Sequence, residues 1–318
     1  MKSLRKVIVR APATTANLGP GFDVFGMALE KPYDTVSITT LPPEEGVKIK
    51  VYGHAKKGIS TDPEKNTAGV VAKQVLKEFS IDSGLLIEIE KGIIPGFGLG
   101  SSAASAAAVA YGLNILFNLK LDNQQLVRFA AQGEKASAGF EHADNVSAAI
   151  FGGFVIIRTY DPLDIISLEA PENLIICVAV PNLPPKPKKT KKARAVLPKV
   201  VELEKLRHNV GHASSMAVGF AIGDLKLIGK SMSDAVVEPA RASLIPGYNI
   251  VKEEAIKAGA YGVAISGAGP SMIAIVDSNL DVAFKVLDAM KHGFESAGVA
   301  AEAFYTKPGK GVKLLEAL

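Results

Sequence analysis

Residues 95–105 read PGFGLGSSAAS, and the chain continues directly into AAAVAYGLNILF. The alternating apolar run LLIEIEKG comes just before, so the pattern predicts a strand, a glycine-rich loop and then a helix. Glycines allow a positive φ and close backbone approach, and the first helical turn offers unpaired N–H groups to an anion. Ser101 and Ser102 can cap this helix, or their hydroxyls can reach a phosphate or a hard cation. The stretch indicates either an anion-binding loop or a plain tight turn.

This loop differs from two common phosphate-binding patterns. A GxxxxGK[ST] loop places a lysine directly before the hydroxyl residue, whereas the run Leu99-Gly100-Ser101-Ser102 contains no lysine. The GxGxG spacing that starts at Gly96 also fails to match the dinucleotide pattern GxGxxG. A loop of this kind needs positive charge from elsewhere if it is to bind phosphate.

The composition indicates a well-packed globular protein with one large or two medium domains. Of 318 residues, 48% are hydrophobic, while the net charge of +4 is too small to favour a nucleic-acid partner. No apolar run has the length of a membrane span, and a strand-like KVIVRAPA begins close to the N-terminus, so we expect no targeting segment. The single cysteine, Cys177 in LIICVAV, predicts a buried thiol and a reducing compartment. We therefore expect a cytoplasmic protein without a membrane partner.

Hydrophobic periodicity predicts a mixed α and β order along the chain. The predicted strands are 5–10, 33–40, 46–52, 85–91, 153–159, 174–180, 261–266, 271–276 and 301–306. The predicted helices are 67–79, 101–117, 122–137, 144–150, 194–232, 249–258 and 279–297. The turn-rich stretch YDPLDIISLEAPEN (160–173) marks a boundary between predicted domains 1–165 and 166–318. The basic, proline-rich segment 181–194 is predicted to be a loop with solvated lysines.

Three motifs, one of which is the glycine loop, together resemble one family. APATTANLGPGFDVFGMAL (11–29), PGFGLGSSAAS and ISGAGPS (265–271) occur in the order and at the distances seen in GHMP kinases. ANLGPGFDVFG, EHADNVSAAIFGGF (141–154) and EPARASLIPGY (238–248) resemble the homoserine kinase branch of that family. The resemblance covers essentially the whole chain. It implies an α+β fold with a ribosomal-protein-S5-like N-terminal ATP-binding domain, a ferredoxin-like C-terminal domain, an active site in the cleft between them, and a homodimer.

The resemblance also implies where ATP and Mg²⁺ bind. The phosphates are expected on Pro95, Gly96, Phe97, Gly98, Leu99, Gly100, Ser101, Ser102, Ala103, Ala104 and Ser105. Adenine and ribose are expected near Asn66 and Lys91, and Mg²⁺ on Ser102 and Glu134. Without the resemblance, Asn66 is more typical of a helix cap and Glu134 of a surface carboxylate.

For the acceptor, the resemblance implies L-homoserine, phosphorylated on its hydroxyl in a step toward threonine. The matching positions are Asn17, Asp23, His142, Asp144, Asn145, Thr190, Arg194, Arg241 and Gly267. Homoserine carries an ammonium and a carboxylate, which suit the anions Asp23 and Asp144 and the cations Arg194 and Arg241. Asp144 and Asn145 are the catalytic candidates, and whether Asp144 or a neighbour accepts the hydroxyl proton stays open, as does a turn role for Asp23 and a capping role for Asp144.

Two rival hypotheses remain at this point. The chain could be a mevalonate-type or shikimate-type kinase of the same family, or a catalytically silent binding protein with the same fold. His208, His212 and Glu204 share one predicted helical face at a spacing that zinc can use, but the sequence offers no further ligand, so we expect a solvated face.

Overall fold

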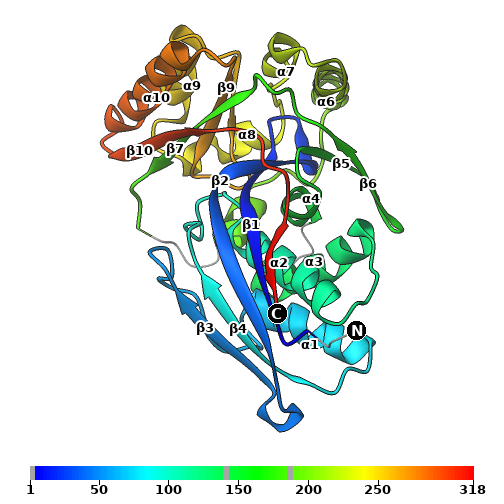
Figure 1. The fold of residues 1–318 in the computed structure, drawn as a ribbon. Coiled ribbons are helices and arrows are strands. Elements are labelled where there is room, and N and C mark those ends of the chain that lie inside the picture. The colour runs from blue at the N-terminus through cyan, green and yellow to red at the C-terminus, as the bar shows by residue number, and fades with distance from the viewer. Residues whose placement is uncertain (1–3, 139–142, 185–188) are drawn as a thin grey trace.

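The computed structural model describes residues 4–138, 143–184 and 189–318, and its larger sheet carries the glycine loop (Figure 1). Its strands run in the order β11-β1-β2-β4-β3, with β5 paired to β2 and β6 paired to β5. β3 and β4 are parallel, and the other pairs are antiparallel. The strands are β1 (Lys6–Asn17), β2 (Gly21–Leu41), β3 (Val47–Tyr52), β4 (Gly84–Glu90), β5 (Phe154–Tyr160), β6 (Leu163–Leu168) and β11 (Lys313–Ala317).

Four helices pack against this sheet and against one another. They are α1 (Thr67–Glu78), α2 (Ser101–Leu116), α3 (Asn123–Ala138) and α4 (Ala143–Phe151), and a short 3-10 helix, η1 (Pro43–Glu45), precedes β3. The alanine-rich α2 is buried on nearly every side, because small side chains let it lie between β1 and the helices α1, α3 and α4. The glycine loop is the connection between β4 and this central helix, so its position is fixed from both ends.

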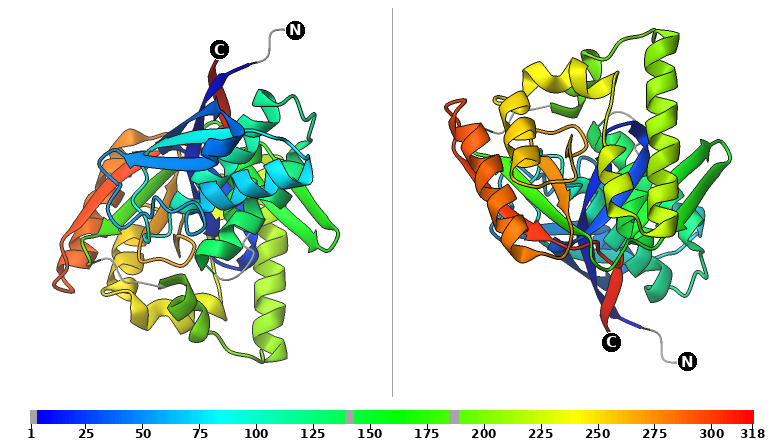
Figure 2. Two further views of the ribbon diagram at one scale, coloured as in Figure 1. Left: turned by 90° about the horizontal axis from the view of Figure 1, so that it is seen from below. Right: turned by 90° about the horizontal axis from the view of Figure 1, so that it is seen from above.

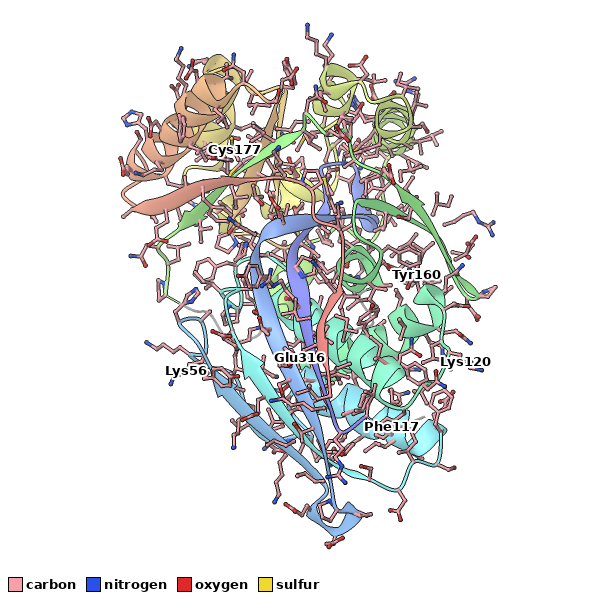
Figure 3. All side chains as sticks on the ribbon, viewed as in Figure 1. Lys56, Phe117, Lys120, Tyr160, Cys177 and Glu316 are labelled. Atoms are coloured by element: carbon pink, nitrogen blue, oxygen red, sulfur yellow. The ribbon has the colours of Figure 1, made fainter. Side chains whose placement is uncertain are left out.

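The second sheet runs in the order β10-β7-β9-β8 and is antiparallel throughout. Its strands are β7 (Ile175–Pro181), β8 (Gly262–Ile265), β9 (Met272–Val276) and β10 (Ala301–Thr306), and α9 (Tyr248–Lys257) and α10 (Leu280–Glu295) pack on it. Alternate residues of β7 enter two different cores: Ile176 joins the large one, and Cys177 joins the one beneath α10 (Figure 3). Burial raises the pKa of the Cys177 thiol to about 12, so the prediction of a buried thiol is confirmed.

The predicted helix 194–232 is wrong, because the chain breaks there into three helices. They are α5 (Lys189–Ala195), α6 (Leu203–Ile222) and α7 (Leu225–Lys230), followed by α8 (Val237–Arg241) and η2 (Ala242–Leu244). Gly223 ends α6 in the left-handed region, and the Asp224 side chain caps α7 by accepting a bond from Leu227 N. α6 runs along the periphery of the molecule (Figure 2). Part of the predicted basic loop is therefore helix α5.

Two strands were not predicted, β6 and β11. β11 pairs with β1 at the edge of the first sheet, so the C-terminal end of the chain returns to the N-terminal strand; Glu316 marks it in Figure 3. The passage from the first sheet to the second falls between β6 and β7, while the boundary between 1–165 and 166–318 stays a prediction. Within the described ranges, no helix is long and apolar enough to cross a membrane.

Candidate active site

A cavity of about 620 Å³ opens where three distant motifs meet. The turn between β8 and β9 joins the other two: Gly267 N donates to Ala16 O (3.0 Å), and Ser266 Oγ donates to Gly98 O (2.7 Å). Asn17 Nδ2 donates to Gly267 O at 2.8 Å and so adds a second bond between the N-terminal motif and this turn. The three motifs of the sequence therefore form one wall.

Most of the predicted site residues line this cavity. They are Asn17, Asp23, Pro95, Gly96, Gly98, Leu99, Gly100, Ser101, Ser102, Ala103, Glu134, Asp144, Asn145, Thr190, Arg194, Arg241 and Gly267. Side chains and backbone from at least seven separate stretches of the chain are thus brought together.

Carbonyl groups of the glycine loop (residues 95–100) accept hydrogen bonds from other parts of the protein. Gly98 O accepts from Ser266 Oγ, and Leu99 O accepts from Thr14 N at 3.1 Å. Among residues 4–138, 143–184 and 189–318, nothing accepts a hydrogen bond from the amides of Gly98 or Gly100. Donor groups facing a cavity at a helix N-terminus are the arrangement that binds an anion.

The two serines after the loop do not cap α2. Gly100 is the N-cap, in the left-handed region with a φ of 65°, and no side chain caps the N–H groups of the first turn. The Ser101 hydroxyl donates to Ile93 O (2.8 Å), and the Ser102 hydroxyl donates to Glu134 Oε2 (3.0 Å). The first turn of α2 is left to a ligand.

Glu134 is buried at the cavity rather than exposed on the surface of α3. Burial is the main cause that raises the pKa of its carboxyl to about 7; the Ser102 bond acts against this rise, and the charge of Asp144 contributes to it. A cation at this point would relieve the repulsion between the two carboxylates. In the described part of the chain, no group of three or more His, Cys, Asp and Glu side chains forms a ready-made metal cage.

Asp23 and Arg194 form an ion pair across the cavity. Arg194 Nη2 donates to both carboxylate oxygens of Asp23, at 3.0 and 2.7 Å. Asp23 has a positive φ of 58° near the start of β2, and its N–H donates to Asn17 Oδ1 (3.2 Å). The Tyr160 hydroxyl, at the end of β5 (Figure 3), donates to Asp23 O at 2.6 Å. Strained backbone held from several sides is typical of a functional position.

Arg241 is buried beside this ion pair. Its Nε donates to Ala193 O (3.1 Å) and its Nη1 to Gly267 O (3.0 Å), so the guanidinium joins α5 to the β8–β9 turn. The Phe22 ring centroid lies 5.2 Å from the guanidinium carbons of both Arg194 and Arg241. Arg241 therefore has a structural contact in addition to facing the cavity.

The catalytic candidates lie at the start of α4. Asp144 Oδ1 accepts from Asn145 N (2.7 Å) and from Asn145 Nδ2 (3.1 Å), while Thr14 Oγ1 donates to Asn145 Oδ1 (2.8 Å). Both side chains border the cavity between the glycine loop and Asp23. The Asn145 side chain is thus fixed by its neighbours, and Asp144 is buried with its carboxylate in the cavity wall.

Several predicted residues do not reach the cavity. Asn66 is buried and caps α1 by accepting from Ala68 N (2.9 Å), which is the alternative that the sequence left open. Lys91 is buried, ion-paired with Asp34, and donates to Ser101 O (2.8 Å). Phe97, Ala104 and Ser105 lie behind the lining, and His142 falls outside the described residues.

Five lining residues were missed from the sequence: Phe22, Gly58, Lys189, Lys191 and Ala268. Phe22 and Ala268 stand inside the quoted motifs, and the two lysines belong to the segment that was predicted to be solvated. The rings of His208 and His212 are in contact, with centroids 4.1 Å apart and planes tilted by 34°, and His208 Nε2 lies 3.0 Å from Ser233 Oγ.

Family models and relatives show the family of the chain. The model for the GHMP kinases N terminal domain matches residues 66–153, and the model for GHMP kinases C terminal matches residues 216–296. The chain belongs to the GHMP kinase family. Within that family it is 51% identical to a homoserine kinase of Methanococcus vannielii, over 86% of this chain and 88% of that one.

Further relatives extend the likeness to nearly full length. A homoserine kinase of Natronomonas pharaonis is 44% identical over 97% of this chain and 99% of its own. The crystal structure of homoserine kinase from Cytophaga hutchinsonii superposes with a TM-score of 0.90 and 39% identity, covering 99% of this chain and 98% of that one. The mevalonate kinase of L. major, at 17% identity and a TM-score of 0.71, shares the fold.

Proposed function

We propose that the protein is a homoserine kinase, which transfers the terminal phosphoryl group of ATP to the hydroxyl of L-homoserine. Homoserine kinases at 44–51% identity are among its relatives. The observation that carries the proposal is the cavity itself, where an anion-binding loop faces side chains of both charges, Asp23, Asp144, Arg194 and Arg241. The products are ADP and O-phospho-L-homoserine.

The glycine loop and the start of α2 suit the phosphates of ATP. Amide donors fixed in place before the ligand arrives cost no reorganisation when charge moves during transfer. Ser102 and Glu134 suit Mg²⁺, since a hydroxyl and a carboxylate are hard oxygen ligands and this ion keeps several waters. When bound, Mg²⁺ supplies positive charge to the phosphate oxygens.

The acceptor side suits a zwitterion. Asp23 and Arg194 pair with each other, and a molecule with an ammonium and a carboxylate can replace that pair without a net change in charge. The ammonium then takes the place of Arg194 beside Asp23, and the carboxylate takes the place of Asp23 beside Arg194. A guanidinium grips a carboxylate through parallel N–H bonds, and the buried Arg241 adds charge nearby.

Asp144 and Asn145 are placed to orient the hydroxyl toward the loop. Asn145 is held by Thr14 and presents a neutral amide, while Asp144 is the carboxylate able to take up the hydroxyl proton. Phosphoryl transfer depends mainly on positioning and on charge neutralisation, so proton removal contributes little to the rate. We further propose a cytoplasmic homodimer.

The proposal is tested with the purified protein, ATP, Mg²⁺ and a panel of acceptor alcohols. ADP release is followed by a coupled assay, and the phosphorylated product is identified by ³¹P NMR and mass spectrometry. L-Homoserine is expected to give the highest kcat/KM, and its product a phosphate ester on the side-chain oxygen. Faster turnover of mevalonate or shikimate, or ADP release with no acceptor dependence, would contradict the assignment.

A further inference from the structure

Lys189 is a positively charged residue that lines the cavity and was not among the predicted site residues. It is the first residue of α5, and its Nζ donates to Gly96 O in the glycine loop at 2.9 Å. Gly96 has open space beside it, since no atom lies within 4 Å of where a Cβ would stand. The lysine thus reaches the loop across space that a ligand can enter.

Three other cations near the loop, Lys91, Arg194 and Arg241, are already engaged with protein groups. Lys91 is buried against Asp34, and Arg194 is paired with Asp23. Arg241 donates to two backbone carbonyls. Lys189 is bonded to one carbonyl oxygen, and no carboxylate of the described ranges lies within ion-pair distance of it.

The surroundings of Lys189 disfavour its charge until an anion is present. Burial, and to a smaller extent the positive charge of Arg241, together lower the pKa of its ammonium to about 7. The charged groups that line the same cavity are Asp23, Glu134, Asp144, Lys191, Arg194 and Arg241. A phosphate on the loop would stabilise the protonated amine by direct attraction.

We propose that Lys189 supplies the positive charge that the glycine loop lacks, by leaving Gly96 O and contacting the terminal phosphates of ATP. A lysine before the hydroxyl residue does this in other phosphate loops, whereas here the cation comes from a helix of the second half of the chain. Because α5 also carries Arg194, nucleotide and acceptor would be held by the same short helix. The inference rests on the proposed kinase function.

Binding calorimetry separates this role from a structural one. The probes are the non-hydrolysable analogue AMPPNP with Mg²⁺, and adenosine, which has no phosphate. Lys189→Met is expected to weaken AMPPNP binding by roughly 10-fold to 100-fold, the loss typical of a charge-assisted contact, with adenosine affinity unchanged. Lys189→Arg keeps most of the AMPPNP affinity. Lys192→Met is the matched control, since Lys192 is exposed on the same helix and away from the cavity lining.

Proton uptake gives a second readout that a structural lysine would not produce. At pH 8 much of Lys189 is neutral in the free protein, and a bound phosphate raises its pKa, so binding takes up a proton. Titrations in two buffers of different ionisation enthalpy measure this uptake. On binding AMPPNP, the wild type is expected to bind about one more proton, at most, than Lys189→Met or Lys189→Arg does. Any contribution of Glu134 is common to all variants and cancels in the difference.

Each outcome has one meaning. Equal AMPPNP affinity and equal proton uptake in the wild type and Lys189→Met would overturn the role of Lys189 and leave the kinase proposal untouched. A parallel loss of adenosine affinity would also overturn it, because the lysine would then support the fold. If the wild type itself fails to bind AMPPNP, the proposed function fails first.

Discussion

The two sides of the cavity are held in place by different forces. On the nucleotide side, backbone bonds fix the glycine loop, and the buried Lys91–Asp34 pair fixes the strand before it. On the acceptor side, the exposed part of the wall depends on an ion pair between two half-buried side chains, Asp23 and Arg194. The first side is therefore set before any ligand binds, whereas the second exchanges an internal ion pair for the charges of its substrate.

The largest expected effect comes from breaking the backbone-held side. A Cβ on Gly98 would stand 2.1 Å from Ser266 O, and its φ of +82° opposes any side chain. Gly98→Val is expected to weaken AMPPNP binding ~100-fold or more and to lower the thermal midpoint, since strain of about 1–3 kcal/mol adds to the clash. Calorimetry and circular dichroism measure both effects.

Gly96→Ala is the control for that variant. Gly96 has the same φ of +82° but open space around it. Backbone strain alone, about 1 kcal/mol, predicts a loss of less than ~10-fold. If both variants lose affinity equally, the close packing of Gly98 against the β8–β9 turn is not what shapes the loop.

The second prediction concerns the role of Lys91, which either stabilises the fold next to the glycine loop or contacts the nucleotide. Lys91→Met leaves the Asp34 carboxylate buried without its cation, which costs about 3–5 kcal/mol of unfolding free energy. Lys48→Met removes an exposed pair with Glu45 and is expected to cost less than about 1 kcal/mol. Urea unfolding compares them. A Lys91→Met protein of normal stability but poor adenosine affinity would instead favour the nucleotide contact predicted from the sequence.

Glu134 lies between the two sides, and its titration gives a third prediction. Its folded pKa of about 7 exceeds the ordinary value of 4.5, so the native state holds its proton longer than the unfolded chain. Stability from this group is complete below pH 4.5 and is lost as the pH rises to about 7. Glu134→Gln avoids the loss and is expected to unfold with a free energy higher by on the order of 3 kcal/mol at pH 8.

The same variant is expected to need more Mg²⁺ for activity, because the neutral amide is a poorer ligand. In the wild type the Mg²⁺ requirement rises as the pH falls below 7, where Glu134 becomes protonated. Activity titrated with Mg²⁺ at pH 6 and pH 8 measures this. If Glu134→Gln needs the same Mg²⁺ concentration as the wild type at both pH values, Glu134 is not a ligand of the metal.

The same contrast explains what could be predicted from the sequence. Asp23, Arg194 and Arg241 were predicted because the sequence resembles the family at these positions, their charges suggested their roles, and all three line the cavity. The contact of Lys91 with Asp34 could not be found, because the partner is distant in the chain and only the folded sheet brings it near.

Two further features, the pairing of β11 with β1 and the position of Lys189, could not be predicted from the sequence. The pairing of β11 with β1 joins opposite ends of the sequence, and no local sequence pattern indicates it. Lys189 stands in a run of prolines and cations that is typical of a solvated loop, and only the position of α5 brings it to Gly96. Roles that depend on residue type were therefore predicted better than roles that depend on packing.

The smallest effect is also the most direct test of the central claim, that charged side chains select a zwitterionic alcohol. The measurement is kcat/KM for L-homoserine, for 4-hydroxybutyrate, which lacks the ammonium, and for 3-aminopropan-1-ol, which lacks the carboxylate. The wild type is expected to prefer homoserine over each by roughly 10-fold to 100-fold, the value of a charge-assisted hydrogen bond. Asp23→Asn should lose its preference over 4-hydroxybutyrate alone, and Arg194→Leu its preference over 3-aminopropan-1-ol alone. Variants that keep both preferences at the wild-type ratio would contradict the claim that this ion pair recognises the substrate.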